Sequence, residues 1–186
     1  MNKAKLLVVP ALILVSALTI IAKTKEEKQA EVRKKAEAVL ARLYKAKPAA
    51  QTAVNQAAGY AVFSNGGMKI LVAGGGKGEG VAIDNATKQV VYMKMREVQA
   101  GLGMGVKKFS TIFVFETKDK LDGFINSGWE FGAQTTAAAK TTEGGGSLEG
   151  ARAISPGVWM YQLTDKGLAL ELTGKGTKYS KNDELN

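Results

Sequence analysis

A run of alternating glycines is the feature that most limits what this chain can fold into. Residues 72–84 read VAGGGKGEGVAID, with glycine at 74, 76, 78 and 80, and a second alternating set follows at 101, 103 and 105. Alternating residues of an extended strand face the same side of a sheet. Each run therefore predicts a strand with one bare face, which permits a sharp bend or the close approach of a neighbouring helix or sheet.

The same glycines do not fit the loops that bind nucleotides. A Walker loop needs Ser or Thr after its lysine and then a helix, whereas Lys77 is followed by Gly78, Glu79 and a strand-like run. The dinucleotide fingerprint G-x-G-x-x-G also fails, because its sixth position falls on Glu79, Val81 or Ile83. We therefore predict an architectural role for the glycines, with Lys77 and Glu79 on the opposite face, towards solvent.

Helical and strand patterns surround the glycine runs. Apolar spacing and turn residues predict three helices, at 23–47, from Pro48 to a cap at Gly59, and from Thr117 to Gly128. Strands are predicted at 60–64, 68–83, 88–95, 110–116 and on both sides of a turn at 165–167, with a flexible loop at 140–151. The fold class is α+β: a curved, glycine-rich antiparallel β-sheet or partly closed barrel, with N-terminal helices and one or two further helices packed on it.

The first 22 residues have the layout of a secretory signal. Lys3 and Lys5 form a basic head, residues 6–22 are apolar, and a polar run begins at Lys23. An uncleaved membrane anchor is the alternative, since the apolar run approaches the length that spans a bilayer. In both cases we expect export to the periplasm or the envelope. The organisation is then a leader or anchor at 1–22, a basic helix at 23–47 and one domain at 48–186.

The amino-acid composition excludes most of the common catalytic mechanisms. The chain has neither Cys nor His, which excludes disulfides, thiolate nucleophiles, Ser-His-Asp triads and metal sites built on His. Carboxylates are present, but nothing in the sequence pairs two of them for acid–base work. We therefore predict a protein that is not an enzyme and has no cofactor and no metal.

Positive charge is concentrated in one segment. Residues 23–47 hold nine bases and four acids, whereas residues 48–186 hold fifteen bases and thirteen acids. Helical spacing gathers an apolar stripe of Val32, Ala36, Val39, Leu40 and Leu43, with Lys34, Lys35, Arg42 and Lys45 together on the far side. Such a helix either lies on an anionic membrane or packs its stripe on its own domain. The nearly neutral body and the lack of a reading motif argue against nucleic acid.

Five segments, taken in order, resemble the SYLF domain family between about Gly59 and Tyr179. They are AAGYAVFSN, GGGKGEGVAID, VQAGLGMGVKKFSTIFVFETKDKLDGF, WEFGAQTTAAA and GVWMYQLTDKGLALELTGKGTKYS. The resemblance implies a lipid-binding module, since eukaryotic members bind phosphoinositides and some bind and bundle actin, while bacterial members are small secreted or membrane-associated proteins. Actin is not an expected partner of an exported chain, which also has no SH3 or FYVE appendage and carries KTTEGGGSLEG where eukaryotic members have a Gly-Pro segment.

Two functions remain open. The first is a non-enzymatic lipid-binding module of the bacterial cell envelope, which binds anionic phospholipid with a phosphoinositide-like headgroup through the basic helix and surface lysines. The resemblance implies lipid contact on the basic helix, at Lys28, Arg33, Lys34, Lys35 and Arg42. The predicted site adds Lys45, Lys77, Lys107 and Lys108, and Lys69, Lys94 and Arg96 are further candidates for the same patch. The alternative is a structural or stress-related envelope protein that associates with itself or with an envelope partner and has no lipid ligand, because glycine-rich strands invite edge pairing.

Overall fold

The computed structural model describes residues 23–70, 73–100, 105–131, 143–168 and 176–186. The elements in chain order are α1 (Lys25–Ala46), α2 (Ala49–Gln56), β1 (Gly59–Ile70), β2 (Ala73–Asp84), β3 (Val90–Ala100), β4 (Gly105–Phe115), α3 (Lys118–Ser127), β5 (Trp129–Phe131), the 3-10 helix η1 (Gly146–Leu148), β6 (Arg152–Ser155), β7 (Val158–Thr164), β8 (Gly167–Leu168) and β9 (Thr177–Lys181). The predicted leader at 1–22 lies outside these residues.

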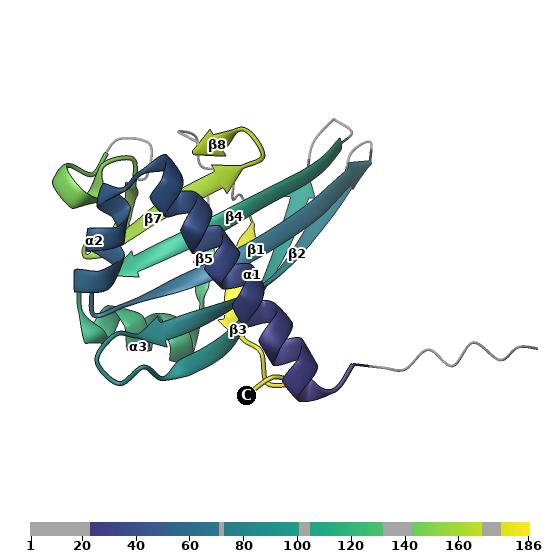
Figure 1. Ribbon diagram of the computed structural model, residues 1–186. Coiled ribbons are helices and arrows are strands. Elements are labelled where there is room, and N and C mark those ends of the chain that lie inside the picture. Colours follow the sequence, from purple (N-terminus) through teal and green to yellow (C-terminus); the bar gives the residue numbers. More distant parts are fainter. Residues whose placement is uncertain (1–22, 71–72, 101–104, 132–142, 169–175) are drawn as a thin grey trace, which may run out of the picture.

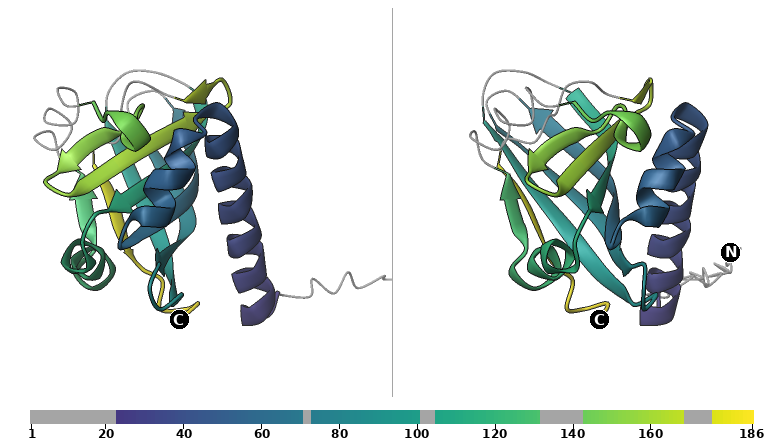
Figure 2. Two further views of the ribbon diagram at one scale, coloured as in Figure 1. Left: turned by 60° about the vertical axis from the view of Figure 1, so that its left-hand side comes forward. Right: turned by 90° about the vertical axis from the view of Figure 1, so that its left-hand side faces the viewer.

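One curled antiparallel sheet organises the described part of the chain. Its strand order is β5-β9-β3-β2-β1-β4-β7-β6, with β8 pairing β7. The helices α1 and α2 lie against one face, called here the outer face, and α3 lies inside the curl (Figures 1 and 2). This arrangement confirms the predicted α+β class, with a curved, glycine-rich sheet, N-terminal helices and a further helix packed on it.

Each face of the sheet has its own core. On the inner face, Phe63, Phe113, Phe124 and Tyr179 form an aromatic cluster, in which the Phe63 and Tyr179 ring centroids are 4.7 Å apart in an edge-to-face arrangement. On the outer face, apolar side chains of α1 and α2 pack on the middle strands. The sheet is thus buried on both sides where the helices cover it.

The glycine stripe of β2 allows the sheet to curl tightly around the inner core. Phe63 and Asn65 of β1 lie opposite Gly80 and Gly78 in the strand pairing. A Cβ at Gly80 would lie 2.6 Å from Phe63 Cδ1, and one at Gly78 would lie 2.8 Å from Asn65 Cγ. The predicted curved strand is confirmed, whereas the close approach of a helix or a second sheet is not: the space beside these glycines is filled by Phe63, Asn65 and the Val62 carbonyl of the paired strand β1. Gly101 and Gly103 lie outside the described residues.

Two predicted element boundaries are wrong. The expected strand at 68–83 is divided between β1 and β2, which form an antiparallel hairpin on either side of residues 71–72. The helix α2 ends at Gln56 rather than at a cap on Gly59, and Gly59 instead begins β1. Its lack of a side chain serves packing, since a Cβ there would lie 2.6 Å from Leu121 Cδ2 of α3.

The later segments agree more closely with the predictions. Leu121 and Phe124 are buried and Gly128 ends α3 at a φ of 70°, although the Thr117 side chain makes no capping hydrogen bond. The turn after Thr164 is confirmed, because β7 and β8 form a hairpin across it. The predicted flexible loop at 140–151 contains η1 in its described part, and η1 lies against α2.

Candidate functional site

The apolar stripe of α1 is buried in the protein's own core. Val32, Ala36, Val39 and Leu43 are buried, and Leu43 is fully inaccessible to solvent. The partly buried Leu40 packs on the same cluster. Of the two interpretations open for this helix, the structure therefore shows the one in which the stripe packs on its own domain.

Polar contacts along both flanks hold α1 in place. Arg33 Nε donates to Tyr92 Oη at 2.5 Å, and the guanidinium carbon lies 5.5 Å from the ring centroid, a cation–π arrangement. On the other flank, Arg42 Nη2 donates to the Thr164 carbonyl at 2.7 Å. Gln29 Nε2 donates to the carbonyl of the buried Leu185, also at 2.7 Å. Two of the predicted lipid-binding cations thus also anchor the helix.

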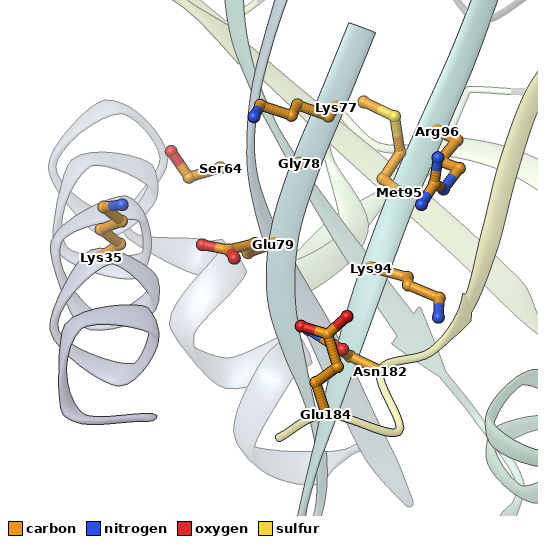
Figure 3. Close-up of a pocket in the computed structure, with 10 residues that line it drawn as sticks. All are labelled: Lys35, Ser64, Lys77, Gly78, Glu79, Lys94, Met95, Arg96, Asn182 and Glu184. Carbon is orange, nitrogen blue, oxygen red and sulfur yellow. The ribbon is translucent and has the colours of Figure 1, made fainter. Parts of the chain in front are cut away.

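Beside α1, the outer face of the sheet carries two adjoining hollows. Their volumes are about 600 Å³ and about 440 Å³, and Lys35 and Ser64 line both. We call the combined feature the basic groove, defined by its six cationic lining residues Lys35, Arg42, Lys77, Lys94, Arg96 and Lys108. In Figure 3, Ser64, Lys77 and Glu79 extend from the sheet towards Lys35 on α1.

Strand register brings these distant cations together. Lys77 of β2 lies opposite Arg96 of β3 on one side and Gly66 of β1 on the other. Gly66 in turn lies opposite Lys108 of β4. Directly paired residues project to the same face of a sheet, so one row across four strands carries three cations and a single bare position at Gly66.

Acidic side chains also line the basic groove, but they are fewer than the cations. Glu79, Asp165 and Glu184 also line the two hollows, so six cations face three carboxylates there. Lys35 is paired with Glu31 at 2.8 Å, one turn earlier on α1. Hydrogen bonds from Lys23 and Lys35 lower the pKa of Glu31 to about 2, so that Glu31 is ionised at neutral pH. The groove retains an excess of positive charge suited to an anion.

The structure brings only some of the predicted site residues together. Lys35, Arg42, Lys77 and Lys108 meet in the basic groove, whereas Arg33 lies against Tyr92. The other predicted cations of α1 are exposed and line neither hollow; they are Lys28, Lys34 and Lys45. Lys107 belongs to β4, opposite Gly67, and its side chain lies outside the described residues.

The predicted grouping of four helix cations on one far side is therefore wrong. Lys35 and Arg42 are seven residues apart, so they lie one above the other beside the apolar stripe, next to the sheet. Lys34 and Lys45 lie on the outward surface of α1 instead, away from both hollows. Ser64 and Gly66 were not recognised in the sequence, because only the strand register places them beside these lysines.

Among the residues that the structure describes, no helix is both long enough and apolar enough to cross a membrane. Within the same ranges, no group of three or more acidic side chains is placed to hold a metal ion.

Comparison with known proteins gives one informative similarity. The chain is 31% identical over 157 residues to Beta cell expansion factor A of Aeromonas veronii, an alignment that covers 84% of this chain and 58% of that protein. The chain thus spans less than two thirds of this relative's length. No protein-family model matches the sequence.

Proposed function

We propose that this protein is a non-enzymatic binding protein that recognises anionic phospholipid at the surface of an envelope membrane. The observation that carries the proposal is the basic groove, in which cations from α1, β2, β3 and β4 converge beside the sheet. Lysine and arginine near an anionic bilayer each contribute about 1 kcal/mol of attraction. Several such residues on one surface supply enough attraction to hold a protein at a membrane.

The groove supports a binding mode different from insertion of an amphipathic helix. The apolar stripe of α1 is already buried against the sheet, with Leu43 fully inaccessible. Inserting that stripe in a bilayer would expose the outer core, whose burial stabilises the fold. In our proposal α1 stays on the sheet and contributes Lys35 and Arg42 to the site. The relative's name describes a factor for beta cell expansion and specifies no ligand, so the proposal rests on the groove.

Vesicle co-sedimentation tests this function. The protein to use is residues 23–186, which contain every described element and both cores. Removing α1 is not a suitable test, because it would strip Val32 and Leu43 from the outer core. We expect binding to vesicles that contain phosphatidylglycerol, weaker binding at high salt because ions screen surface charges, and none to phosphatidylcholine vesicles.

Two adjacent lysines of α1 provide a matched pair of variants. Lys35→Glu reverses the cation that both hollows share, while Lys34→Glu makes the same change on the outward surface. Lys35→Glu is expected to weaken binding about tenfold and Lys34→Glu about twofold at most. Equal losses would mean that charge alone attracts the protein and that the groove is not the site. If the wild type does not bind anionic vesicles but forms oligomers, self-association replaces lipid binding as the proposed function.

A further inference from the structure

Gly66 forms a bare patch on the floor of the basic groove. It lies in the regular part of β1, paired with β2 on one side and β4 on the other. A Cβ built on Gly66 would have no heavy atom within 4 Å, whereas most described strand glycines of β1 and β2 would meet a neighbour. Neither tight packing nor a positive φ therefore accounts for a glycine here.

Cations surround this bare patch on several sides. Lys77 and Lys108 are its direct neighbours on the adjoining strands. Their Cα atoms are two strand spacings apart, about 10 Å, and their flexible side chains can reach over Gly66 from opposite sides. Ser64 lies two residues earlier on the same face, and Lys35 of α1 lines both hollows there. The result is a shallow cradle with a flat floor, two flanking ammonium groups and a third on α1. Glu79, opposite Ser64 on β2, contributes one carboxylate at its edge.

We infer that this cradle, defined by Gly66, Lys77, Lys108, Ser64 and Lys35, is a subsite for a phosphate monoester. The inference rests on the proposed function and names the chemical group that the groove selects. A monoester carries a charge between about −1.5 and −2 at neutral pH and three strong acceptor oxygens. Three ammonium groups and a hydroxyl match this group, whereas the phosphodiester of most phospholipids has one charge and two free oxygens.

A side chain at Gly66 would fill the cradle without changing any charge. Gly66→Val adds a β-branched residue, which strands accept well, at a position with open space above it. Gly75→Val is the matched control, because Gly75 lies on the same face of β2, is exposed and would make only an ordinary 3.5 Å contact with the Glu97 carbonyl. Gly75 lines neither hollow.

The experiment compares two kinds of anionic vesicle matched in surface charge. One contains phosphatidic acid, a phosphate monoester, and the other contains phosphatidylglycerol, a diester. We expect residues 23–186 to prefer phosphatidic acid by about tenfold. Gly66→Val should abolish the preference, so that the two kinds of vesicle bind equally, while Gly75→Val should keep the preference of the wild type. Circular dichroism on both variants checks folding. If Gly66→Val is unfolded, the double variant Lys77→Gln and Lys108→Gln replaces it; this variant should weaken binding to both vesicles, but binding to phosphatidic acid more, so that the preference is lost.

Glycerol 3-phosphate, added to the vesicles, identifies the source of the ligand. Displacement of the protein would show that the soluble monoester is sufficient for binding. Retention would assign the site to phosphate presented by a membrane. Either result supports the cradle if Gly66→Val has lost the preference. A Gly66→Val variant that keeps the preference would overturn the inference. Equal binding of the wild type to both vesicles would do so as well, while leaving the proposed function intact; binding to neither would remove the proposed function itself.

Discussion

The inner face of the sheet and the basic groove use glycine in opposite ways. On the inner face, Gly80 and Gly78 have no side chain because Phe63 and Asn65 occupy the space beside them. In the groove, the space beside Gly66 is open and lysines flank it. A glycine with close neighbours is required by packing, whereas in our proposal the open space beside Gly66 keeps the surface free for a ligand.

The outer face itself shows the same contrast over a short distance. Beneath α1 it is apolar and closed, with Val62, Val81 and Ile112 buried in the same core as the apolar stripe of the helix. Along β1 and β2, towards their hairpin, the same face turns polar at Ser64 and Glu79 and then cationic at Lys77. The edge of α1 therefore separates the part of this face that stabilises the fold from the part that we propose binds lipid.

The largest expected effect comes from the closed part of the outer face. Leu43→Ala removes a fully buried side chain from the contact between α1 and the sheet. We expect a loss of about 3 kcal/mol in the free energy of unfolding, from lost apolar burial and the cavity left behind. Urea denaturation measures it. A loss below about 1 kcal/mol would mean that α1 is only loosely attached and would favour a helix that leaves the sheet.

A smaller effect separates the two kinds of glycine. Gly80→Ala places a methyl group 2.6 Å from Phe63 Cδ1, and we expect it to cost about 2 kcal/mol in the free energy of unfolding through overpacking. Gly66→Ala, which adds the same methyl group in open space, should stay within about 0.5 kcal/mol of the wild type. Equal losses in urea denaturation would show that the distinction between closed and open glycines is wrong.

The smallest predicted effect is a gain in affinity. Glu31→Gln removes the carboxylate that pairs with Lys35 at 2.8 Å, which frees a groove cation, so binding to anionic vesicles should tighten about threefold. The pKa of Glu31 is lowered to about 2, well below the ordinary glutamate value of about 4.3. Glu31 is therefore ionised at mildly acidic as well as at neutral pH. The gain should therefore be the same at about pH 5 and about pH 7. Unchanged or weaker binding would exclude competition between Glu31 and the lipid.

Periodicity in the sequence was enough to predict the elements that depend on local pattern. The stripe of α1 follows from the spacing of Val32, Val39 and Leu43, and the bare face of β2 follows from its alternating glycines. The hairpin between β1 and β2 was missed because the sequence at 70–73, where the two paired strands meet, is apolar and contains no Asn or Asp to mark a turn. Gly59 was misread because a glycine after a helix usually indicates a cap.

The groove was harder to predict because it depends on tertiary structure. Lys77 and Lys108 are 31 positions apart in the sequence and become neighbours of Gly66 only through the register of three strands. Lys35 joins them because of the direction in which α1 crosses the sheet, as Figure 1 shows. Strand alternation in the sequence predicts that Lys94 and Arg96 share one face of β3. It does not predict that α1 covers that same face.

The central claim is that the assembled groove, and not the outward surface of α1, binds anionic lipid. Two triple variants of residues 23–186 remove the same amount of charge from each: Lys35→Gln, Lys77→Gln and Lys108→Gln in the groove, and Lys28→Gln, Lys34→Gln and Lys45→Gln on the helix. Their affinity for phosphatidylglycerol vesicles is the measurement. We predict about a hundredfold loss for the groove triple and less than about fivefold for the helix triple. The reverse order would contradict the account and return the lipid site to the exposed surface of α1.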